Sequence, residues 1–268
     1  MKIKEICQKF KIVPLKKRGQ NFLINKRILE KILKVAEIKK DDIILEIGAG
    51  FGNLTEELAK KAKKVIAVEI DKKLIEFLKE KFKNKKNVEI IEGDILKISV
   101  QNLLKENDYK LVANLPYSIT GAVLKKFLTQ EPKPKEMILM VQKEVAERIV
   151  EKNKKRSIIS LMVNFYSFPK IVCYVSKNNF WPRPKVDSAL LKISKIKSIK
   201  IDPNSFFKLI KKGFSNPRKQ LINNLAQLIE KEKIKKIFKN LKIDPQIRAE
   251  DLNLKDWLKI YQKFQKYL

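Results

Sequence analysis

Two short apolar runs on either side of a glycine-rich segment constrain the fold of this chain more than any other feature. Residues 42–47, DIILEI, lead into the glycines of GAGFG, and residues 64–69, KVIAVE, follow further along. Their β-branched residues predict strands, while Leu54, Leu58 and Ala62, four positions apart, predict a helix between them. A strand, a helix and a second strand in this order indicate a βαβ unit and therefore a parallel sheet.

The alternation of strands and helices continues through the first two thirds of the chain. Asp71 is a suitable N-cap for a helix whose buried face would hold Leu74, Phe77, Leu78 and Phe82. Further strands are predicted at 88–91, 110–113 and 136–141. Beyond about residue 198 the pattern is helical and lysine-rich. We therefore predict an α/β domain over 1–198, with ligands at the carboxyl ends of its strands, and a small all-helical domain over 199–268.

Composition suggests the kind of partner. The formal net charge is +31, which favours a polyanion such as nucleic acid, because each neutralised phosphate releases counterions. Only seven of the 61 basic residues are arginine, so a general lysine bias of the proteome explains part of this charge. The basic charge is therefore informative only beside a site that acts on a nucleic acid.

Other residue types exclude several classes of protein. Cys7 and Cys173 are too few and too distant for a disulfide framework or a zinc site, and no apolar run reaches the length of a membrane span. The N-terminus lacks the apolar core of a secretory signal. We expect a cytoplasmic protein without metal or membrane contact. The absence of histidine argues against triad hydrolysis and zinc-dependent deamination.

The loop LEIGAGFGNLT, residues 45–55, is the first segment with chemical meaning. Glycines that follow a strand and precede a helix let the backbone approach a ligand closely. The loop lacks the Gly-Lys-Ser/Thr ending of a phosphate-binding loop, and Asn53 stands where a dinucleotide fingerprint needs its third glycine. The loop suits a ligand with an adenosine and an amino-acid tail but without phosphate.

Acidic residues at the next two strand ends narrow the choice of ligand. Glu69 is placed to accept hydrogen bonds from both ribose hydroxyls. Asp94 is placed to accept one from an adenine amino group, with Ile70 and Ile95 against the faces of the ring. Carboxylates around the pocket would repel a diphosphate and tolerate a sulfonium cation. The sequence therefore predicts an S-adenosylmethionine site that includes Gly48, Glu69 and Asp94.

The segment ANLPYSIT, residues 113–120, follows the fourth predicted strand. The Asn114 side-chain oxygen and the Leu115 carbonyl can accept both N–H bonds of an adenine amine, which frees its lone pair for the sulfonium methyl group. Pro116 would hold that carbonyl in place and Tyr117 would stack on the base. Rate would come from orientation and electrostatics and needs no strong general base.

Six segments together resemble the ribosomal RNA adenine N6,N6-dimethyltransferase family, and within it the bacterial small-subunit branch. They are GQNFLIN (19–25), LEIGAGFGNLT, VEID, EGDIL, ANLPYSI and NNFWPRPKVDSAL (178–190). The resemblance implies a Rossmann-like methyltransferase domain with a seven-stranded, mainly parallel sheet, plus a small helical domain. It also implies dimethylation of two adjacent adenines in the 3′-terminal hairpin loop of 16S rRNA, as an aid to small-subunit biogenesis.

The resemblance also assigns roles to single residues. Asn21 and Leu23 would contact the methionine part of the cofactor and close over it. The remaining positions that match cofactor contacts of the family are Gly48, Glu69, Asp94 and Asn114. Phe180, expected in a loop because of the nearby prolines, would stack on the base opposite Tyr117. FSNPRKQL (214–221) only partly matches a basic segment of the family, because Pro217 replaces an arginine and Asn216-Pro217 is also typical of a helix start. The residues expected to contact RNA are Lys16, Lys17, Arg18, Arg156, Arg183, Arg218 and Lys219.

Three alternatives remain at this point. A large-subunit rRNA adenine methyltransferase of the macrolide-resistance type shares the fold and the catalytic segment. A DNA adenine methyltransferase would use an Asn-Pro-Pro-Tyr loop and a target-recognition domain. An RNA-binding assembly factor would bind the particle with catalysis as a secondary role. We expect a monomer that acts on 16S rRNA in the immature small subunit.

Overall fold

The computed structural model describes residues 3–14, 19–104 and 108–268 of the chain. Its contacts divide the chain into two compact units, Met1–Ala146 with Phe168–Ile196, and Glu147–Ser167 with Lys197–Leu268. The sequence places a single boundary at 198/199. The structure moves that boundary by two residues and adds 147–167 to the helical unit.

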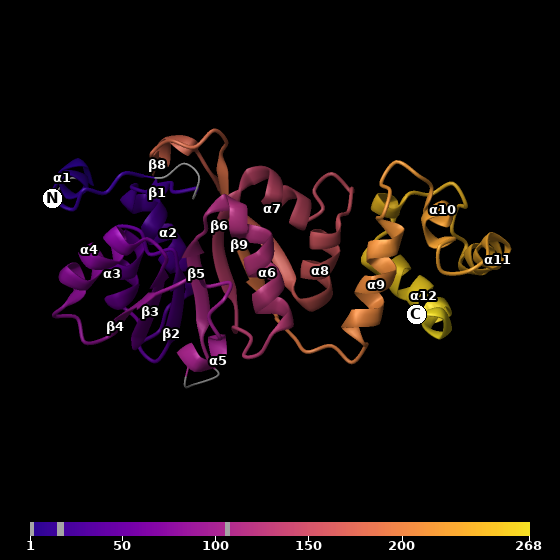
Figure 1. Cartoon of the computed structure of the whole chain (residues 1–268), viewed down its shortest axis with the longest axis horizontal. Coiled ribbons are helices and arrows are strands. Elements are labelled where there is room, and N and C mark those ends of the chain that lie inside the picture. Colours follow the sequence, from indigo (N-terminus) through magenta and orange to yellow (C-terminus); the bar gives the residue numbers. More distant parts are fainter. Residues whose placement is uncertain (1–2, 15–18, 105–107) are drawn as a thin grey trace. The chain divides into compact units, whose positions relative to one another are not determined.

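A seven-stranded sheet forms the centre of the first unit (Figure 1). Its order is β4-β3-β2-β5-β6-β9-β7. The first five strands in this order are parallel, whereas β9 is antiparallel to both β6 and β7. This confirms the predicted α/β fold with a mainly parallel seven-stranded sheet. The strands are β2 (Ile43–Ile47), β3 (Lys64–Glu69), β4 (Val88–Glu92), β5 (Lys110–Asn114), β6 (Met137–Gln142), β7 (Phe168–Val175) and β9 (Ser188–Ser194).

Helices connect the parallel strands as the sequence predicts. Asp71 caps α4, and its side chain accepts a hydrogen bond from the Lys73 amide at 3.1 Å. The four apolar residues expected on one face of α4 are buried. By contrast, α3 ends at Ala59, so Ala62 lies outside it. The helices are α1 (Ile3–Lys9), α2 (Lys26–Ala36), α3 (Asn53–Ala59), α4 (Lys72–Phe82), α5 (Val100–Leu103), α6 (Thr120–Thr129) and α7 (Lys143–Ile149), whose last three residues belong to the second unit.

One apolar core cluster packs the helices α2 and α3 against the sheet. Ile32 of α2, Leu58 of α3 and Ile44 of β2 belong to one buried cluster with residues of β5 and β6. Burying an aliphatic side chain of this size contributes about 1.5–3 kcal/mol relative to an exposed one. This packing fixes the strand ends from which the functional side chains project.

A two-stranded ribbon joins distant parts of the first unit. In it β1 (Phe22–Leu23) pairs antiparallel with β8 (Phe180–Trp181). The pairing brings the GQNFL segment next to NNFWP, although 150 or more residues separate them in sequence.

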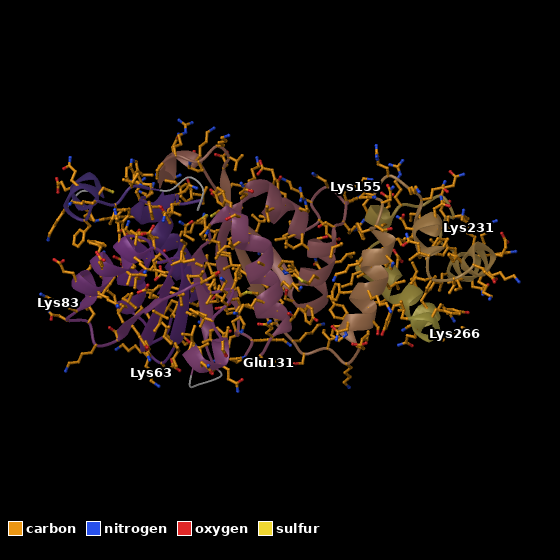
Figure 2. The ribbon with its side chains drawn as sticks, viewed as in Figure 1. Lys63, Lys83, Glu131, Lys155, Lys231 and Lys266 are labelled. Carbon is orange, nitrogen blue, oxygen red and sulfur yellow. The ribbon has the colours of Figure 1, made fainter. Side chains whose placement is uncertain are left out.

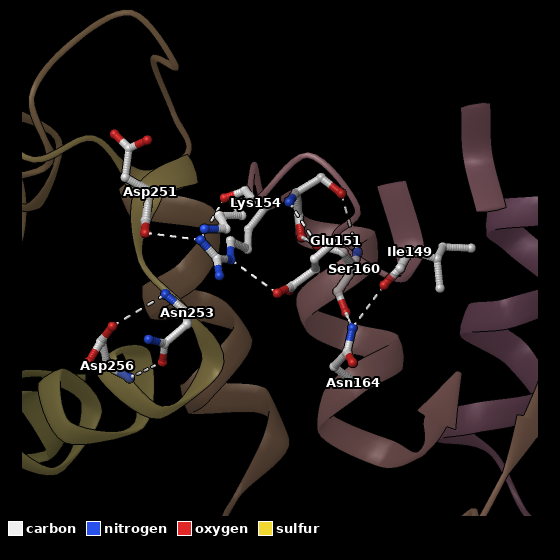
Figure 3. A network of polar contacts seen from close by, with 10 residues as sticks. Ile149, Glu151, Lys154, Ser160, Asn164, Asp251, Asn253 and Asp256 are labelled. Carbon is white, nitrogen blue, oxygen red and sulfur yellow. Dashed lines mark hydrogen bonds and ion pairs between the residues drawn. The ribbon is translucent and has the colours of Figure 1, made fainter. Parts of the chain in front are cut away.

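The second unit is helical, as predicted for the C-terminal part of the chain. Its helices are α8 (Ile158–Tyr166), α9 (Pro203–Gly213), α10 (Leu221–Leu225), α11 (Lys231–Leu241) and α12 (Leu254–Phe264). Phe165 of α8 stacks on Phe206 of α9 with ring centroids 4.8 Å apart, which explains why 147–167 group with the C-terminal helices. Polar contacts tie the 149–164 segment to residues near Asp251 (Figure 3).

No helix in the part of the chain that the structure describes is both long and apolar enough to cross a bilayer. Lysine side chains cover much of the surface, and Lys83 and Lys231 are among those that project from the ribbon in Figure 2.

Candidate functional site

Seven of the residues predicted to be catalytic or to bind the cofactor line one cavity of about 260 Å³. The cavity lies beyond the carboxyl ends of β2, β3, β4 and β5, where parallel α/β sheets bind their ligands. Among the described residues, its lining contains no lysine or arginine. The seven residues are Asn21, Gly48, Glu69, Asp94, Asn114, Leu115 and Pro116.

The glycine loop forms the floor of this cavity. Gly48 and Gly50 have φ of 73° and 57°, in the left-handed region that favours glycine. A Cβ on Gly50 would lie 2.7 Å from the Phe22 ring, so a larger residue there would displace the GQNFL segment. Because glycine has no Cβ, the loop leaves the cavity open and leaves room for the GQNFL segment to pack over it.

Glu69, at the end of β3, is buried and is held by backbone amides. Its Oε2 accepts a hydrogen bond from the Gly50 amide at 2.9 Å, and its Oε1 accepts from the amides of Ile70 and Asp71 at 2.9 and 3.1 Å. Burial raises the pKa of Glu69, and the amide hydrogen bonds oppose that rise. The carboxylate is thus fixed in orientation, as ribose recognition requires.

Asp94 follows β4 in a loop that lines the cavity. Its Oδ1 accepts a hydrogen bond from the Leu96 amide at 2.9 Å. Ile95 is buried, whereas Ile70 is 50% exposed although it is a large apolar side chain. Both isoleucines line the cavity, as expected for residues that cover the faces of an adenine ring.

Asn114, the last residue of β5, has a defined amide orientation. Its Nδ2 donates a hydrogen bond to the Asn21 carbonyl at 2.9 Å. A carbonyl oxygen only accepts, so the NH₂ group of Asn114 must face Asn21 and its Oδ1 faces the other way. The GQNFL segment therefore orients the Asn114 oxygen that is expected to accept from the substrate amine.

The residues after Asn114 form a rigid turn into α6. The Leu115 amide donates to the Met140 carbonyl at 3.2 Å, and Pro116 has φ −55° and ψ 128°. The Tyr117 hydroxyl lies 2.8 Å from the Ser188 Oγ, at the start of β9. Burial raises the pKa of Tyr117, and the hydrogen bond with Ser188 opposes the rise. Ser188 lies in the VDSAL segment, and the sequence alone gave it no role.

Glu46 is a second residue to which the sequence reading assigned no role. It is 1% exposed, and its Oε2 has no hydrogen-bond partner among the described residues. It lines a small void of about 30 Å³ together with Gly48, Gly50 and Asn114. Burial raises the pKa of Glu46 to about 8. The only signal in the sequence is an acid two residues before the first glycine.

Two predicted site residues have buried side chains. Leu23 and Phe180 are 5% and 3% exposed and belong to the same apolar cluster. Phe180 lies in β8 and not in the loop that the prolines predict, because it pairs with Leu23 of β1. In this conformation the Phe180 ring is covered, so stacking on a base requires a local movement of the β1–β8 ribbon.

The predicted RNA-contacting residues fall into three groups. Lys16, Lys17 and Arg18 lie outside the described residues. Arg156 pairs with Glu151 at 3.0 Å and donates to the Asp251 carbonyl at 3.2 Å within the network of Figure 3. Arg183, Arg218 and Lys219 are exposed, each within its own unit. Pro217 does not start a helix: residues 214–220 form a turn between α9 and α10.

The fold and the cavity define an S-adenosylmethionine-dependent methyltransferase of class I. The model of the family described as "Ribosomal RNA adenine dimethylase" matches residues 15–266. The chain belongs to this family and is an S-adenosylmethionine-dependent rRNA adenine dimethyltransferase.

Curated relatives span nearly the whole chain. A "Ribosomal RNA small subunit methyltransferase A" from Dehalococcoides mccartyi is 45% identical over 96% of this chain and 90% of its own length. One of the same name from Clostridium botulinum is 40% identical over 97% of each. The similarity therefore includes both units.

Solved structures agree with this assignment. A dimethyladenosine transferase from Plasmodium falciparum has a TM-score of 0.80 and 30% identity, covering 92% of this chain and 98% of its own. The 23S rRNA methyltransferase ErmE has a TM-score of 0.74 at 23% identity, covering 91% and 100%, which shows the shared fold alone.

The described residues fit the cofactor of this class. Glu46, Glu69 and Asp94 place three carboxyl groups on or beside the cavity, and one oxygen of Glu46 is unpaired. This environment suits a ligand that carries a sulfonium and an ammonium group. Within the described residues no cluster of three or more potential metal-ligating side chains is found.

Proposed function

We propose that this enzyme dimethylates N6 of two adjacent adenines in the 3′-terminal hairpin loop of 16S rRNA. The substrate would be the rRNA within an immature small subunit, and the modification would aid small-subunit biogenesis in the cytoplasm. The enzyme would act as a monomer. The names of the relatives support the small-subunit substrate, and the fixed orientation of Asn114 at the cavity supports transfer to an exocyclic amine.

The proposed roles of the residues follow from this geometry. S-adenosylmethionine supplies the methyl group. Glu69 and Asp94 would hold its ribose and adenine, with Gly48 beneath it and Asn21 and Leu23 in the segment that closes over it. The Asn114 Oδ1 and the Leu115 carbonyl would accept from the substrate amine and stabilise the positive charge that develops on nitrogen. Pro116 would fix that carbonyl, and Tyr117 would stack on the base. Phe180 would stack on the base once a movement of the β1–β8 ribbon exposes its ring.

A loop adenine suits this site because it is already partly unstacked, so its extrusion costs less than opening a duplex. The exposed residues proposed to contact RNA are Arg183 in the first unit, and Arg218 and Lys219 in the second. Binding through phosphates predicts that rRNA affinity falls steeply as salt rises.

The direct test is methyl transfer to immature small subunits with labelled cofactor, followed by mapping of the modified adenines by mass spectrometry. We expect dimethyladenine on the 3′-terminal hairpin. Methylation of large-subunit rRNA would instead support the macrolide-resistance alternative, and stable binding without transfer would support an assembly factor.

Asn114→Ala provides the test of the catalytic segment. Loss of one preorganised acceptor should lower turnover by roughly 10²–10³-fold while rRNA binding is kept. Asn84→Ala, at an exposed position after α4, is the matched control and should retain full activity. An active Asn114→Ala variant would refute the proposed role of this amide.

A further inference from the structure

Lys126 is a buried lysine whose ammonium group donates to three backbone carbonyls of one loop. It lies on α6, which begins at Thr120 after a single 3-10 turn over Tyr117–Ile119, and it is 9% exposed. Its Nζ donates to the carbonyls of Ile95, Leu96 and Ile98 at 2.7, 3.3 and 2.5 Å. An ammonium group has three N–H donors, so these three contacts use all of them.

The three carbonyls belong to the loop that forms the Asp94 side of the cavity. Gly93, Asp94, Ile95 and Leu96 line the cavity, and Lys126 does not. The loop folds around Asp94, whose carbonyl accepts from the amides of Lys97 and Ile98 at 2.8 and 3.0 Å. Its amides therefore turn inward to Asp94, while its carbonyls turn outward to Lys126.

We propose that Lys126 is a positioning residue that sets the Asp94 loop for recognition of the cofactor's adenine amine. The inference rests on the proposed roles of Asp94 and Asn114. Asp94 would touch the cofactor, and Lys126 would act through it.

The experiment compares two ligands that differ at the adenine amine and at the neighbouring N1 atom. These are S-adenosylhomocysteine and S-inosylhomocysteine, in which an oxygen replaces the amine and N1 carries a hydrogen. Their dissociation constants are measured by calorimetry without RNA for the unmodified enzyme, Lys126→Met, Lys126→Arg and the control Lys125→Met. Lys125 is exposed on the same helix, so its replacement tests the loss of a charge without the loop contacts.

We expect Lys126→Met to weaken S-adenosylhomocysteine binding by about tenfold or more, and S-inosylhomocysteine binding much less, so that discrimination between the two collapses. Lys126→Arg keeps the charge and the donors and should retain most of the discrimination between the two ligands. Lys125→Met should behave like the unmodified enzyme. In methyl transfer, the KM for the cofactor should rise while kcat at saturating cofactor stays within about threefold.

Equal weakening of both ligands, or unchanged discrimination in a folded Lys126→Met variant, would overturn the inference. If Lys126→Met does not fold, Lys126→Gln replaces it in a double-mutant cycle with Asp94→Asn. Lys126→Gln should weaken S-adenosylhomocysteine binding in the parent enzyme but not in the Asp94→Asn background, and additive losses would overturn the inference. Because these measurements contain no rRNA, a failure to methylate the 16S hairpin would defeat the proposed function without affecting them.

Discussion

The two ends of the parallel strands hold their buried charges in different ways. At the amino ends, Lys110 pairs with Asp42 at 2.9 Å and with Glu136 at 3.5 Å, and donates to the Ala36 carbonyl at 2.9 Å. At the carboxyl ends, Glu46 forms no ion pair among the described residues, and Glu69 is held by amides alone. The charged residues at both ends are buried, so the difference lies in their partners: oppositely charged side chains at the amino ends and backbone amides at the carboxyl ends.

The difference separates a structural site from a ligand site. A buried charge with partners contributes to a defined fold, whereas a buried acid without a cation raises the free energy of the folded protein. Such an acid at a cavity indicates a cationic ligand that completes the pairing. The amino ends therefore hold the strands together, and the carboxyl ends are built for the methyl donor.

The largest expected effect is a loss of stability on removing Lys110, the buried cation at the amino ends of the strands. Lys110→Met leaves Asp42 buried without its cation, while Glu136 keeps Lys192 at 3.0 Å. The loss should lower the free energy of unfolding by about 3–5 kcal/mol. Urea unfolding measures this loss. Lys79→Met, at an exposed position of α4, should change stability by less than about 0.5 kcal/mol. If folded Lys110→Met also lost about 3–5 kcal/mol of cofactor-binding free energy, the amino ends would not be purely structural, and the distinction between the two strand ends would fail.

The second prediction concerns the unpaired end and its pH dependence. The pKa of Glu46 is about 8, so the acid is protonated at lower pH and attracts a cation only after it loses the proton. Affinity for S-adenosylmethionine should therefore rise by up to tenfold per pH unit between about pH 6 and 7.5. Calorimetry in buffers of different ionisation enthalpy should detect proton release on binding.

Glu46→Gln supplies the contrast for this pH dependence. The amide does not titrate, so the slope and the released proton should both disappear. A slope that persists in Glu46→Gln would assign the proton to another group, with Glu69 the next to test because burial also raises its pKa.

The sequence predicted the elements better than the contacts between them. The parallel strands, the Asp71 cap and the cavity residues from Gly48 to Asn114 follow from local patterns, because periodicity and strand-end position are local properties. The burial of Phe180 and the bond between Tyr117 and Ser188 depend on strands that pair across long sequence distances. No local pattern predicts such a pairing.

The same limit applies to charge. From the sequence, the positive charge of Arg156 suggests an RNA contact. In the structure its guanidinium pairs with Glu151 and donates to the carbonyl of Asp251, 95 residues away. Glu46 has the appearance of an ordinary strand acid until the structure shows that its Oε2 lacks a partner. Partners decide the role of a charged residue, and partners are set by the tertiary fold.

A third prediction addresses the stability of the unliganded enzyme. The folded-state pKa of Glu46 lies above its ordinary value, so the folded state binds this proton more tightly than the unfolded state does. Stability is therefore lost as pH rises toward about 8, by at most about 1.4 kcal/mol per pH unit. Glu46→Gln should become more stable than the unmodified enzyme by about 1–3 kcal/mol between pH 6 and 8. The difference should stop growing above about pH 8.

Thermal unfolding across this pH range measures the difference. Glu76→Gln, at an exposed position of α4, should leave the pH profile unchanged. A constant difference between Glu46→Gln and the unmodified enzyme would show that Glu46 is ionised throughout, and would contradict an unpaired acid at this end.

The smallest effect concerns the hydrogen bond between Tyr117 and Ser188 beside the cavity. Tyr117→Phe removes the hydroxyl that meets Ser188 and keeps the ring, so stability should fall by about 0.5–1.5 kcal/mol while stacking on the base is preserved. Ser188→Ala should cost a similar amount, and the double variant should cost less than the sum of the two. Urea unfolding of the four proteins measures this coupling. Additive losses would show that the hydroxyl and Ser188 act independently, and that the ring is held by packing alone.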